Sequence, residues 1–365
     1  MKIKEVIARL EQRFPLYWQE DFDNCGIQCG DKEREVTGIM ICFDMSEKVI
    51  DEAISKNCNM VISHHPIIYK TGLKKIEPTN RVGKVVCKAL ENKILLYSMH
   101  TNMDSGIEGG NVLFAQKLGL QNLEVLAPKT DMFRKLIVFV PQADADHLKQ
   151  SLFDAGAGEL GKYQHCSYST DGKGSFLPVE GANPAIGTVG TEEQVAELKL
   201  EVIFPVALQK KVVETLFAHH PYEEPAFDIL KLENLNYHVG LGRVGTLPEP
   251  MELTEFLQFA KKQLNLEVIK YSGKIGRKIQ KVAVCGGGGA SYVSDALAMN
   301  ADIYLTGDIK YHDYFIPENR MVVADIGHFE GENFIRDIIY NEINKIFTNF
   351  ASYISEDEKL EISWI

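Results

Sequence analysis

Two adjacent histidines, His64 and His65, stand at the end of a short apolar run in the first third of the chain. The run, residues 60–62, predicts a buried strand, and Pro66 prevents a helix from starting directly after it. Neighbouring side chains at a strand end point in different directions. The two imidazoles therefore suit two metal ions, one each, better than they suit one ion, and such a site needs carboxylates from elsewhere in the chain.

Two later segments supply the missing ligand types. His100 and Asp104 follow the apolar run at residues 94–97, and His328 and Glu332 follow another apolar run near the end of the chain. A spacing of four places His328 and Glu332 on one face of a helix. Divalent ions bind neutral imidazole and carboxylate, and a pair of ions commonly shares a bridging carboxylate and a bridging water.

The sequence therefore predicts a site for two divalent metal ions. The alternative is that the histidine pair forms a turn and that His328 lies on the surface, but three separate ligand groups at strand ends favour the metal site. Zinc is the expected ion, although Mn²⁺, Fe²⁺ and Co²⁺ accept the same donors. The predicted ligands are His64, His65, Asp104, His328 and Glu332.

Two further histidines are candidates for handling protons in a reaction at this site. His100 either orients a metal ligand or is a core histidine. His312, in the polar segment 308–312, either donates and accepts protons or belongs to an ordinary loop. Glu330 lies between two predicted ligands but points away from them along a helix, so it is not predicted to bind metal.

Two weaker patterns have structural explanations that are at least as good as functional ones. Residues 219–225, His-His-Pro-Tyr-Glu-Glu-Pro, indicate a turn or an oligomer contact more than a metal site. The glycines at 286–289 precede a predicted helix and have backbone N–H groups that could hold phosphate. They lack the Lys-Ser/Thr ending of a P-loop and the GxGxxG spacing, and close packing of strand against helix explains them equally well.

The first 128 residues alternate between predicted strands and helices, which indicates a mainly parallel sheet covered by helices. Ser46 is expected to be the N-cap of the helix that follows the strand predicted at residues 38–43. Residues 21–30 are expected to form a polar turn bounded by glycine. In such sheets ligands gather beyond the carboxyl ends of the strands, where the predicted metal ligands fall.

The pattern changes between residues 129 and 236 and then returns to alternating strands and helices until residue 365, where a long helix from His328 is expected to close the fold. Two β-α-β halves in about one hundred residues suggest a ferredoxin-like α+β module inserted into an α/β domain. The predicted domains are residues 1–128, 129–236 and 237–365. The elements expected in the module are strands at 135–140, 163–170, 174–178, 198–204 and 226–232, and helices at 143–155 and 209–218.

Composition narrows the classes of function. The chain has 365 residues, 45% hydrophobic and 25% charged, with a formal net charge of −12. Such a balance is typical of a soluble globular protein and argues against a nucleic-acid partner. Seven scattered cysteines without a CxxC pair do not form a disulfide framework. No apolar run is long enough to span a membrane and no signal peptide is evident, so a cytoplasmic location is expected.

These motifs together resemble the NGG-interacting-factor-three-like family, whose members carry the name GTP cyclohydrolase I type 2 homologue. The resemblance rests on His64-His65-Pro66 and on the segments 100–104, 306–312 and 327–332, and it runs essentially end to end. Phe22 stands where the family usually has Trp. The resemblance implies a dinuclear metal site on the same five residues, a homohexameric toroid, and a middle insertion like the PII signalling and copper-tolerance trimer fold.

The motifs and the resemblance together predict one of two functions, which belong to different classes. The first is a metal-dependent hydrolase acting on a nucleotide-like small molecule, with ring opening of GTP as the reaction that the resemblance implies. The second is a non-catalytic metal-binding regulatory or scaffold protein whose inserted module senses a small ligand.

Overall fold

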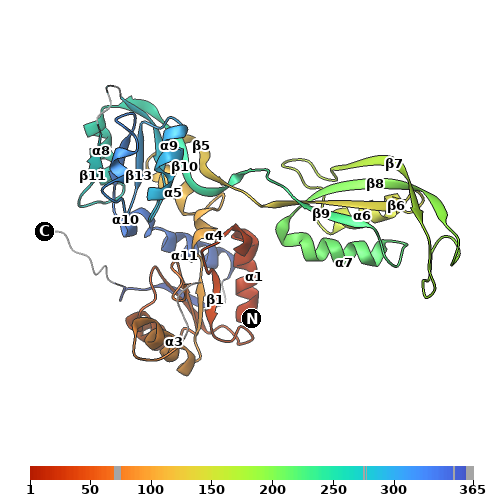
Figure 1. Ribbon diagram of the computed structural model, residues 1–365. Coiled ribbons are helices and arrows are strands. Elements are labelled where there is room, and N and C mark those ends of the chain that lie inside the picture. Colours follow the sequence, from red (N-terminus) through yellow and green to blue (C-terminus); the bar gives the residue numbers. More distant parts are fainter. Residues whose placement is uncertain (70–74, 274–275, 277, 348–349, 359–365) are drawn as a thin grey trace. The chain divides into compact units, whose positions relative to one another are not determined.

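The computed structural model describes residues 1–69, 75–273, 276, 278–347 and 350–358. The chain divides into two compact units, which are described separately. The first unit combines Met1–Lys129 with Tyr237–Ile365, and the second is the continuous segment Thr130–Asn236. In Figure 1 the strands and helices of the second unit are coloured yellow to green. None of the described helices is long and apolar enough to cross a membrane.

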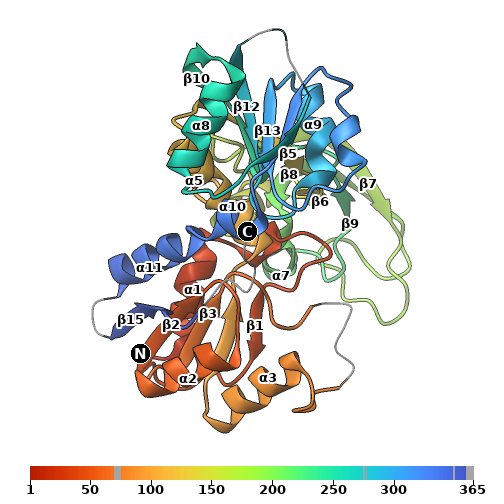
Figure 2. The ribbon, with the colours of Figure 1, turned by 90° about the vertical axis from the view of Figure 1, so that its left-hand side faces the viewer.

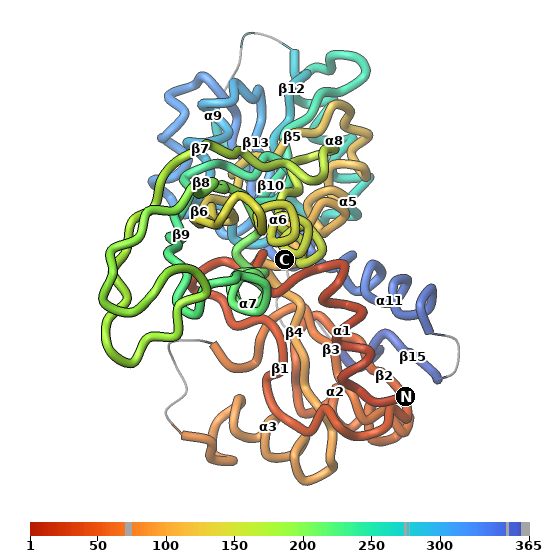
Figure 3. The backbone as a smooth tube through the Cα atoms, turned by 90° about the vertical axis from the view of Figure 1, so that its right-hand side faces the viewer, coloured from red at the N-terminus to blue at the C-terminus, as the bar shows by residue number. Residues whose placement is uncertain are grey.

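The amino-terminal half of the first unit contains, within the described residues, a five-stranded sheet in the order β1-β4-β3-β2-β15. The pairs β15-β2, β2-β3 and β3-β4 are parallel, and β1 pairs antiparallel with β4. The carboxyl-terminal strand β15 thus lies beside β2 from the start of the chain (Figure 3). The strands are β1 (Gly26–Cys29), β2 (Gly38–Cys42), β3 (Met60–Ser63), β4 (Leu95–Ser98) and β15 (Ala351–Ile354).

Helices cover both faces of this sheet because its side chains alternate. Ile41 and Ile62 pack against α1 and α11 on one face, whereas Met40 and Val61 pack against α2 and α3 on the other. Ser46 caps α2 by accepting the N–H of Val49, as predicted. The elements around this sheet are α1 (Ile3–Arg13), η1 (Leu16–Trp18), α2 (Glu47–Ser55), α3 (Arg81–Glu91), α4 (Thr101–Asp104), α5 (Gly110–Lys117) and α11 (Ile335–Ile346).

The other half of the first unit contains, over the described residues, six strands in the order β11-β14-β13-β12-β10-β5. The central strands β12, β13 and β14 are parallel. Helices α5 and α8 cover one face and α9 covers the other (Figure 2). The elements are β5 (Gln121–Lys129), β10 (Asn236–Met251), α8 (Leu253–Gln263), β11 (Lys270–Ser272), β12 (Ile279–Val284), η3 (Ala290–Tyr292), α9 (Val293–Ala298), β13 (Ile303–Thr306), η4 (Asp313–Phe315), β14 (Val322–Asp325) and α10 (His328–Glu332).

Strand register brings the predicted ligand segments to common edges. In the amino-terminal sheet, Cys42 is paired with Ser63 and Ser63 with Ser98, so β2, β3 and β4 end level with one another. In the other sheet, Thr306 is paired with Asp325 in the same way. The residues that follow these strands therefore start from the same edge of each sheet, as expected for ligands at the carboxyl ends of parallel strands.

The second unit contains, in the part of the chain described, a sheet in the order β7-β8-β6-β9 whose neighbouring strands are all antiparallel. With helices after its first and third strands, this is the β-α-β-β-α-β arrangement of ferredoxin-like folds. Val138 and Leu200 pack under the helices in its core. The elements are β6 (Phe133–Pro141), α6 (Ala145–Asp154), β7 (Ser167–Phe176), β8 (Glu193–Pro205), η2 (Val206–Leu208), α7 (Gln209–His219) and β9 (Phe227–Lys231).

Three local predictions are wrong. In place of the strands predicted at 163–170 and 174–178 there is one strand, β7, because pairing with β8 continues through Gly172 between them. The turn predicted at 21–30 contains the short edge strand β1, held by β4. The closing helix is broken into α10 and α11, with the weak helix formers Gly331 and Asn333 beside the break.

Candidate metal centre

The five side chains predicted as metal ligands converge at the carboxyl ends of the two sheets of the first unit. His64 and His65 follow β3, Asp104 ends α4, and α10 carries the remaining two, His328 and Glu332. The structure thereby joins segments that lie far apart in sequence, such as His65 and His328, which are 263 positions apart. Three groups offer ligand atoms within 4.8 Å of one another: His64 with Asp104 and Glu332, His65 with His328 and Glu332, and His64 with His65 and His100.

The carboxylate of Glu332 is shared by two of these groups. Its Oε2 atom lies 3.5 Å from Nε2 of His64, 3.6 Å from Nε2 of His65 and 3.3 Å from Nε2 of His328. Oδ2 of Asp104 lies 3.7 Å from Nε2 of His64. Two atoms that bind one ion tetrahedrally at about 2.1 Å are about 3.4 Å from each other. The separations in the cluster therefore match those of atoms around shared metal ions.

Both histidines after β3 are held through Nδ1, and their Nε2 atoms face Glu332. Nδ1 of His64 lies 2.9 Å from the carbonyl oxygen of Met99. Nδ1 of His65 lies 3.1 Å from Oδ1 of Asp44. An acceptor at this position favours the tautomer with hydrogen on Nδ1 and leaves the Nε2 lone pair available to a metal.

Helix α10 presents its two ligands with similar support. Nδ1 of His328 lies 2.7 Å from Oδ2 of Asp308, which orients the ring as Asp44 orients that of His65. The carboxylate of Glu332 packs against Gly287, which has a φ of +62°. A Cβ atom on Gly287 would lie 2.1 Å from Oε1 of Glu332. Only glycine fits here, because a side chain would be strained and would displace the carboxylate.

Burial and neighbouring charges separate the pKa values of the imidazoles. Burial lowers the pKa of His64 to about 4. Burial also opposes the charge on His65, but its contacts with Asp44 and Glu332 outweigh this and raise its pKa to about 10. The pKa of His328 rises to about 9, because contacts that include Glu332 again outweigh burial. In the absence of a cation, protons on these two rings therefore balance the charge of Glu332.

The two carboxylates shift in opposite directions. Although burial opposes its ionisation, the electrostatic attraction of the surrounding imidazoles holds the pKa of Glu332 well below its usual range. Burial, reinforced by the charge of Glu332, raises the pKa of Asp104 well above its usual range. A bound divalent cation would favour the ionised form of Asp104, because the ion would be the largest charge in the site.

The polar atoms at the centre of the cluster fit a metal ion. Nε2 of His64 and Oε2 of Glu332 are buried and have no hydrogen-bond partner among the described residues. An unsatisfied buried polar atom costs about 1–3 kcal/mol. Imidazole nitrogen and carboxylate oxygen are the donors that Zn²⁺, Mn²⁺, Fe²⁺ and Co²⁺ accept. A divalent ion bonded to both atoms would remove that cost.

A comparison with known protein families gives a match over nearly the whole chain. The model of the Duf34/NIF3 (NGG1p interacting factor 3) family matches residues 1–359. The chain belongs to this family. Over 331 residues it is 39% identical to the GTP cyclohydrolase 1 type 2 homolog of Bacillus subtilis. The alignment covers 89% of this chain and 88% of the relative. Over 360 residues it is 34% identical to the GTP cyclohydrolase 1 type 2 homolog of Staphylococcus epidermidis, covering 98% of both chains.

A solved structure supports the fold as well. The Bacillus cereus protein related to NIF3 matches with a TM-score of 0.80 and 35% identity, covering 100% of this chain and 99% of that one. The predicted α/β fold class and the predicted Duf34/NIF3 family are therefore confirmed.

His100 lies beside the histidine pair of this Duf34/NIF3 chain. Its ring centroid is 5.0 Å from that of His64 and 5.2 Å from that of His65. Nδ1 of His100 lies 2.9 Å from Oδ1 of the buried Asp23. Burial opposes the charge of Asp23, but hydrogen bonds from His100 and Thr101 lower its pKa below the usual range. The ring of His100 is therefore oriented by a carboxylate, as the rings of other histidines in the cluster are.

His312 is less closely connected to the cluster. It is exposed, and its ring packs edge-on against Tyr311 at 5.3 Å. The ligand groups found among the described residues do not include it. From the same segment, Asp308 reaches His328. A role of His312 in proton handling stays a prediction.

Backbone N–H groups of the glycine-rich segment 286–289 are used in contacts inside the protein. The N–H of Gly286 donates to Oδ1 of Asn111 at 2.8 Å, and the N–H of Gly289 donates to Oγ1 of Thr306 at 2.9 Å. These two donors are satisfied within the protein, and Gly287 makes room for Glu332. Close packing, one of the two explanations considered from the sequence, accounts for these glycines.

The cluster at residues 219–225 forms a turn. Nε2 of His220 lies 2.9 Å from the carbonyl oxygen of Phe139, and Nδ1 accepts the N–H of Tyr222 at 3.1 Å. Both ring nitrogens of His220 are thereby engaged inside the second unit. The arrangement supports the structural interpretation of this motif over a metal site.

Several supporting residues were missed from the sequence. Asp44 follows β2, so the rule that ligands gather at strand ends could have found it. Phe43 packs against both histidines, with ring centroids 5.4 Å from His64 and 4.5 Å from His65. Asn111, whose amide donates to the carbonyl oxygen of Asp104 at 3.1 Å, had no recognisable signal.

Proposed function

We propose that the protein is a dinuclear metal-dependent hydrolase acting on a nucleotide-like substrate. The observation that carries this proposal is the position of Oε2 of Glu332, 3.3–3.6 Å from Nε2 of three histidines. One carboxylate oxygen among several imidazoles is the arrangement of a bridging ligand. Paired ions with such bridges are common in enzymes that cleave with water.

In this proposal one ion is held by His65, His328 and Glu332, and the second by His64, Asp104 and Glu332. Both groups bring ligand atoms together and share the same glutamate, which supports the assignment. Zinc is the first candidate, because imidazole and carboxylate donors suit it, and Mn²⁺, Fe²⁺ and Co²⁺ are the alternatives.

When bound, the two ions would supply Lewis acidity and lower the pKa of a water molecule toward neutrality. The chain itself orients the ligands, since Asp44 and Asp308 hold the Nδ1 atoms of His65 and His328. His100 is held at Nδ1 by Asp23, so its Nε2 is the nitrogen that we assign to proton transfer with the substrate. His312 is the second candidate for that role.

The first substrate to test is GTP. The relatives from Bacillus subtilis and Staphylococcus epidermidis carry the name GTP cyclohydrolase 1 type 2 homolog, which motivates this choice. In the proposed reaction, water adds to C8 of the purine, the five-membered ring opens, and a second water releases C8 as formate.

Turnover by protein loaded with two equivalents of metal would test this proposal. GTP is added, and both the absorbance change of ring opening and the formate released are followed. We expect turnover that falls by more than about a hundredfold in Asp104→Ala. The control is Glu330→Gln, which alters a carboxylate on α10 outside the three ligand groups and should retain activity. Metal-loaded protein that turns over neither GTP nor a panel of other nucleotides and phosphoesters would overturn the hydrolase proposal.

That negative result would favour the alternative, a non-catalytic metal-binding regulatory or scaffold protein. The observation that supports it is a cavity in the second unit, which could accept a small ligand. For either function we propose a homohexamer, as the family resemblance implies. Light scattering should then give six times the chain mass of 41.0 kDa, and a monomer mass would contradict this.

A further inference from the structure

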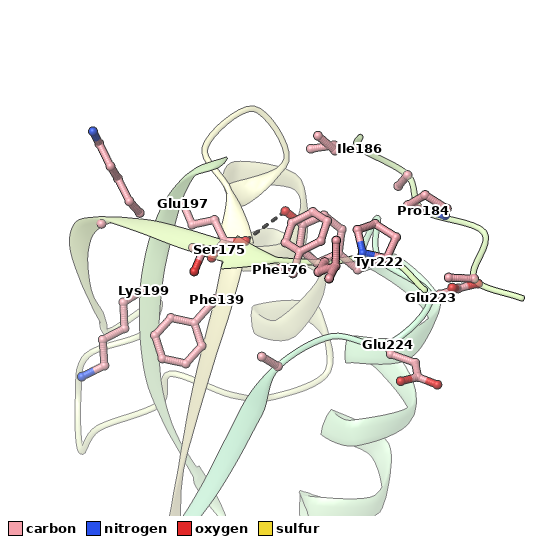
Figure 4. Close-up of a pocket in the computed structure, with 18 of the residues that line it drawn as sticks. Phe139, Ser175, Phe176, Pro184, Ile186, Glu197, Lys199, Tyr222, Glu223 and Glu224 are labelled. Carbon is pink, nitrogen blue, oxygen red and sulfur yellow. Dashed lines mark hydrogen bonds between the residues drawn. The ribbon is translucent and has the colours of Figure 1, made fainter. Parts of the chain in front are cut away.

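The second unit contains a cavity of about 590 Å³. Phe139 of β6 and Glu197 of β8 line it (Figure 4). Side chains alternate along a strand, so these two residues point to the face of the sheet opposite Val138 and Leu200, which pack under the helices. The cavity therefore lies on the face that α6 and α7 leave open.

Aromatic and aliphatic side chains form much of the wall. The rings of Phe176 and Tyr222 meet edge to face with centroids 5.7 Å apart, and Phe139 adds a third ring from β6. Across from them, Pro184 and Ile186 contribute apolar surface from the segment between β7 and β8 (Figure 4). Faces of aromatic rings attract cations as well as apolar groups.

A hydrogen bond ties this segment to the turn before β9. The N–H of Asn183 donates to Oε1 of Glu223 at 2.9 Å. The segment that carries Pro184 and Ile186 is thus anchored next to Tyr222 rather than free at its tip. The walls of the cavity are therefore supported from both sides.

One of the polar groups that line this cavity is a buried carboxylate. Glu197 is only 7% exposed, and its Oε1 accepts the O–H of Tyr222 at 2.9 Å. Burial and the charge of Glu197 raise the pKa of Tyr222, so the phenol remains a donor. A Cβ atom on Gly174 would lie 2.1 Å from Oε2 of Glu197, so glycine is what leaves room for the carboxylate.

The lysines on this face are directed to another acid. Lys135 and Lys199 form ion pairs with Glu201 at 3.0 and 2.7 Å. Within the residues that the structure describes, Glu197 has no ion pair with a basic side chain. Burying a carboxylate without a cation is unfavourable, and a positively charged ligand would offset that cost.

We propose that this cavity binds a small organic cation, an ammonium or guanidinium group on an apolar or aromatic body, with Glu197 as its counter-ion. Its volume falls in the range of about 300–1,000 Å³ typical of small-molecule sites. Anionic ligands such as nucleotides are disfavoured, because the lining carries four acidic residues and only two lysines: Asp171, Glu197, Glu223 and Glu224, and Lys173 and Lys199. The inference does not depend on the metal centre.

Calorimetric titration of the full-length protein tests the proposal. The probes are phenethylammonium, benzyltrimethylammonium and butylguanidinium, with 2-phenylethanol as a neutral match for the first. We expect saturable binding of at least one cation, and phenethylammonium should bind at least about tenfold more tightly than 2-phenylethanol. No binding of any cation up to about 10 mM, or equal binding of amine and alcohol, would overturn it.

Matched variants locate the site. Glu197→Gln keeps the shape and the acceptor for Tyr222, and it should weaken cation binding at least about tenfold while leaving 2-phenylethanol unaffected. Glu214→Gln removes an exposed acid of α7, outside the cavity, and should change nothing. Ile186→Trp places a larger side chain in the cavity and should weaken binding of both the cation and 2-phenylethanol. This variant replaces Glu197→Gln as the test if Glu197→Gln does not fold. Cation binding that survives both Glu197→Gln and Ile186→Trp would contradict the assignment.

Discussion

Two buried glutamates, one in each unit, are surrounded by different chemistries. Glu332 faces imidazole nitrogens whose rings are fixed by acceptors on their far side. Glu197 accepts a hydrogen bond from Tyr222 and is bordered by aromatic rings and aliphatic side chains. A buried carboxylate therefore does not by itself specify a ligand. Imidazole lone pairs turned toward Glu332 would suit a metal ion, whereas aromatic faces around Glu197 would suit the organic cation that we propose.

The largest expected effect is on metal content. Glu332→Gln removes the negative charge shared by two ligand groups, so affinity for metal should fall by more than about a hundredfold. Elemental analysis after dialysis should show about two ions per chain in the parent protein and fewer than one in the variant. Glu330→Gln on the same helix should retain the full content. Equal metal content in both variants would show that Glu332 is not a ligand that the two ions share.

Metal affinity should also rise with pH. Without metal, the pKa of His65 is about 10 and that of His328 is about 9, so both rings are protonated near neutrality and must lose a proton to bind an ion. Between about pH 6 and about pH 8, affinity should increase by up to about a hundredfold per pH unit if both protons are displaced. Calorimetry in buffers of different ionisation enthalpy would count the released protons. An affinity that is independent of pH would contradict the raised pKa values.

A smaller loss is expected when an orienting acceptor is altered. Asp44→Asn keeps the size of the side chain but weakens its hold on Nδ1 of His65, and metal affinity should fall by about 10- to 100-fold. Competition with a fluorescent chelator would measure this. Asp51→Asn, on an exposed ion pair with Lys88, is a suitable control. If both variants bind metal equally well, the contact of Asp44 does not contribute to the site.

The smallest effect concerns the second unit. Tyr222→Phe leaves the buried carboxylate of Glu197 without its phenol donor, which should lower the free energy of unfolding by about 1–3 kcal/mol. Urea unfolding would measure the change. Tyr168→Phe, at an exposed position on β7, should have little effect, and neither variant should alter metal content. If Tyr168→Phe lowered the free energy of unfolding as much as Tyr222→Phe does, the buried hydrogen bond of Tyr222 would not be the cause of the loss.

The residues of the candidate metal centre were accessible from sequence because each follows an apolar run. His64, Asp104 and His328 are of types that metals bind, and parallel strands bring their carboxyl ends to one edge. The supporting contacts were less accessible. Asn111 meets Asp104 and Gly286 only through tertiary packing, and no local pattern marks it.

The errors in strand prediction have a common physical cause. Glycines interrupt the local pattern at β1 and β7, yet pairing with neighbouring strands maintains both. Strand β15 at Ala351–Ile354 was not foreseen, because its partner β2 lies more than three hundred positions earlier. The cavity around Glu197 was also missed, since its walls come from three strands, β6, β7 and β8, and from two connecting segments.

The pairing of β15 with β2 has a consequence for biosynthesis. Residues 351–354 complete a sheet that begins at the other end of the chain, and His328 meets His65 across 263 positions. At about 5–20 residues per second, a ribosome needs roughly 15–50 s to span that interval. During this time the nascent amino-terminal sheet has an open edge and only part of the cluster, so the complete cluster could capture a cation only after Glu332 has been made.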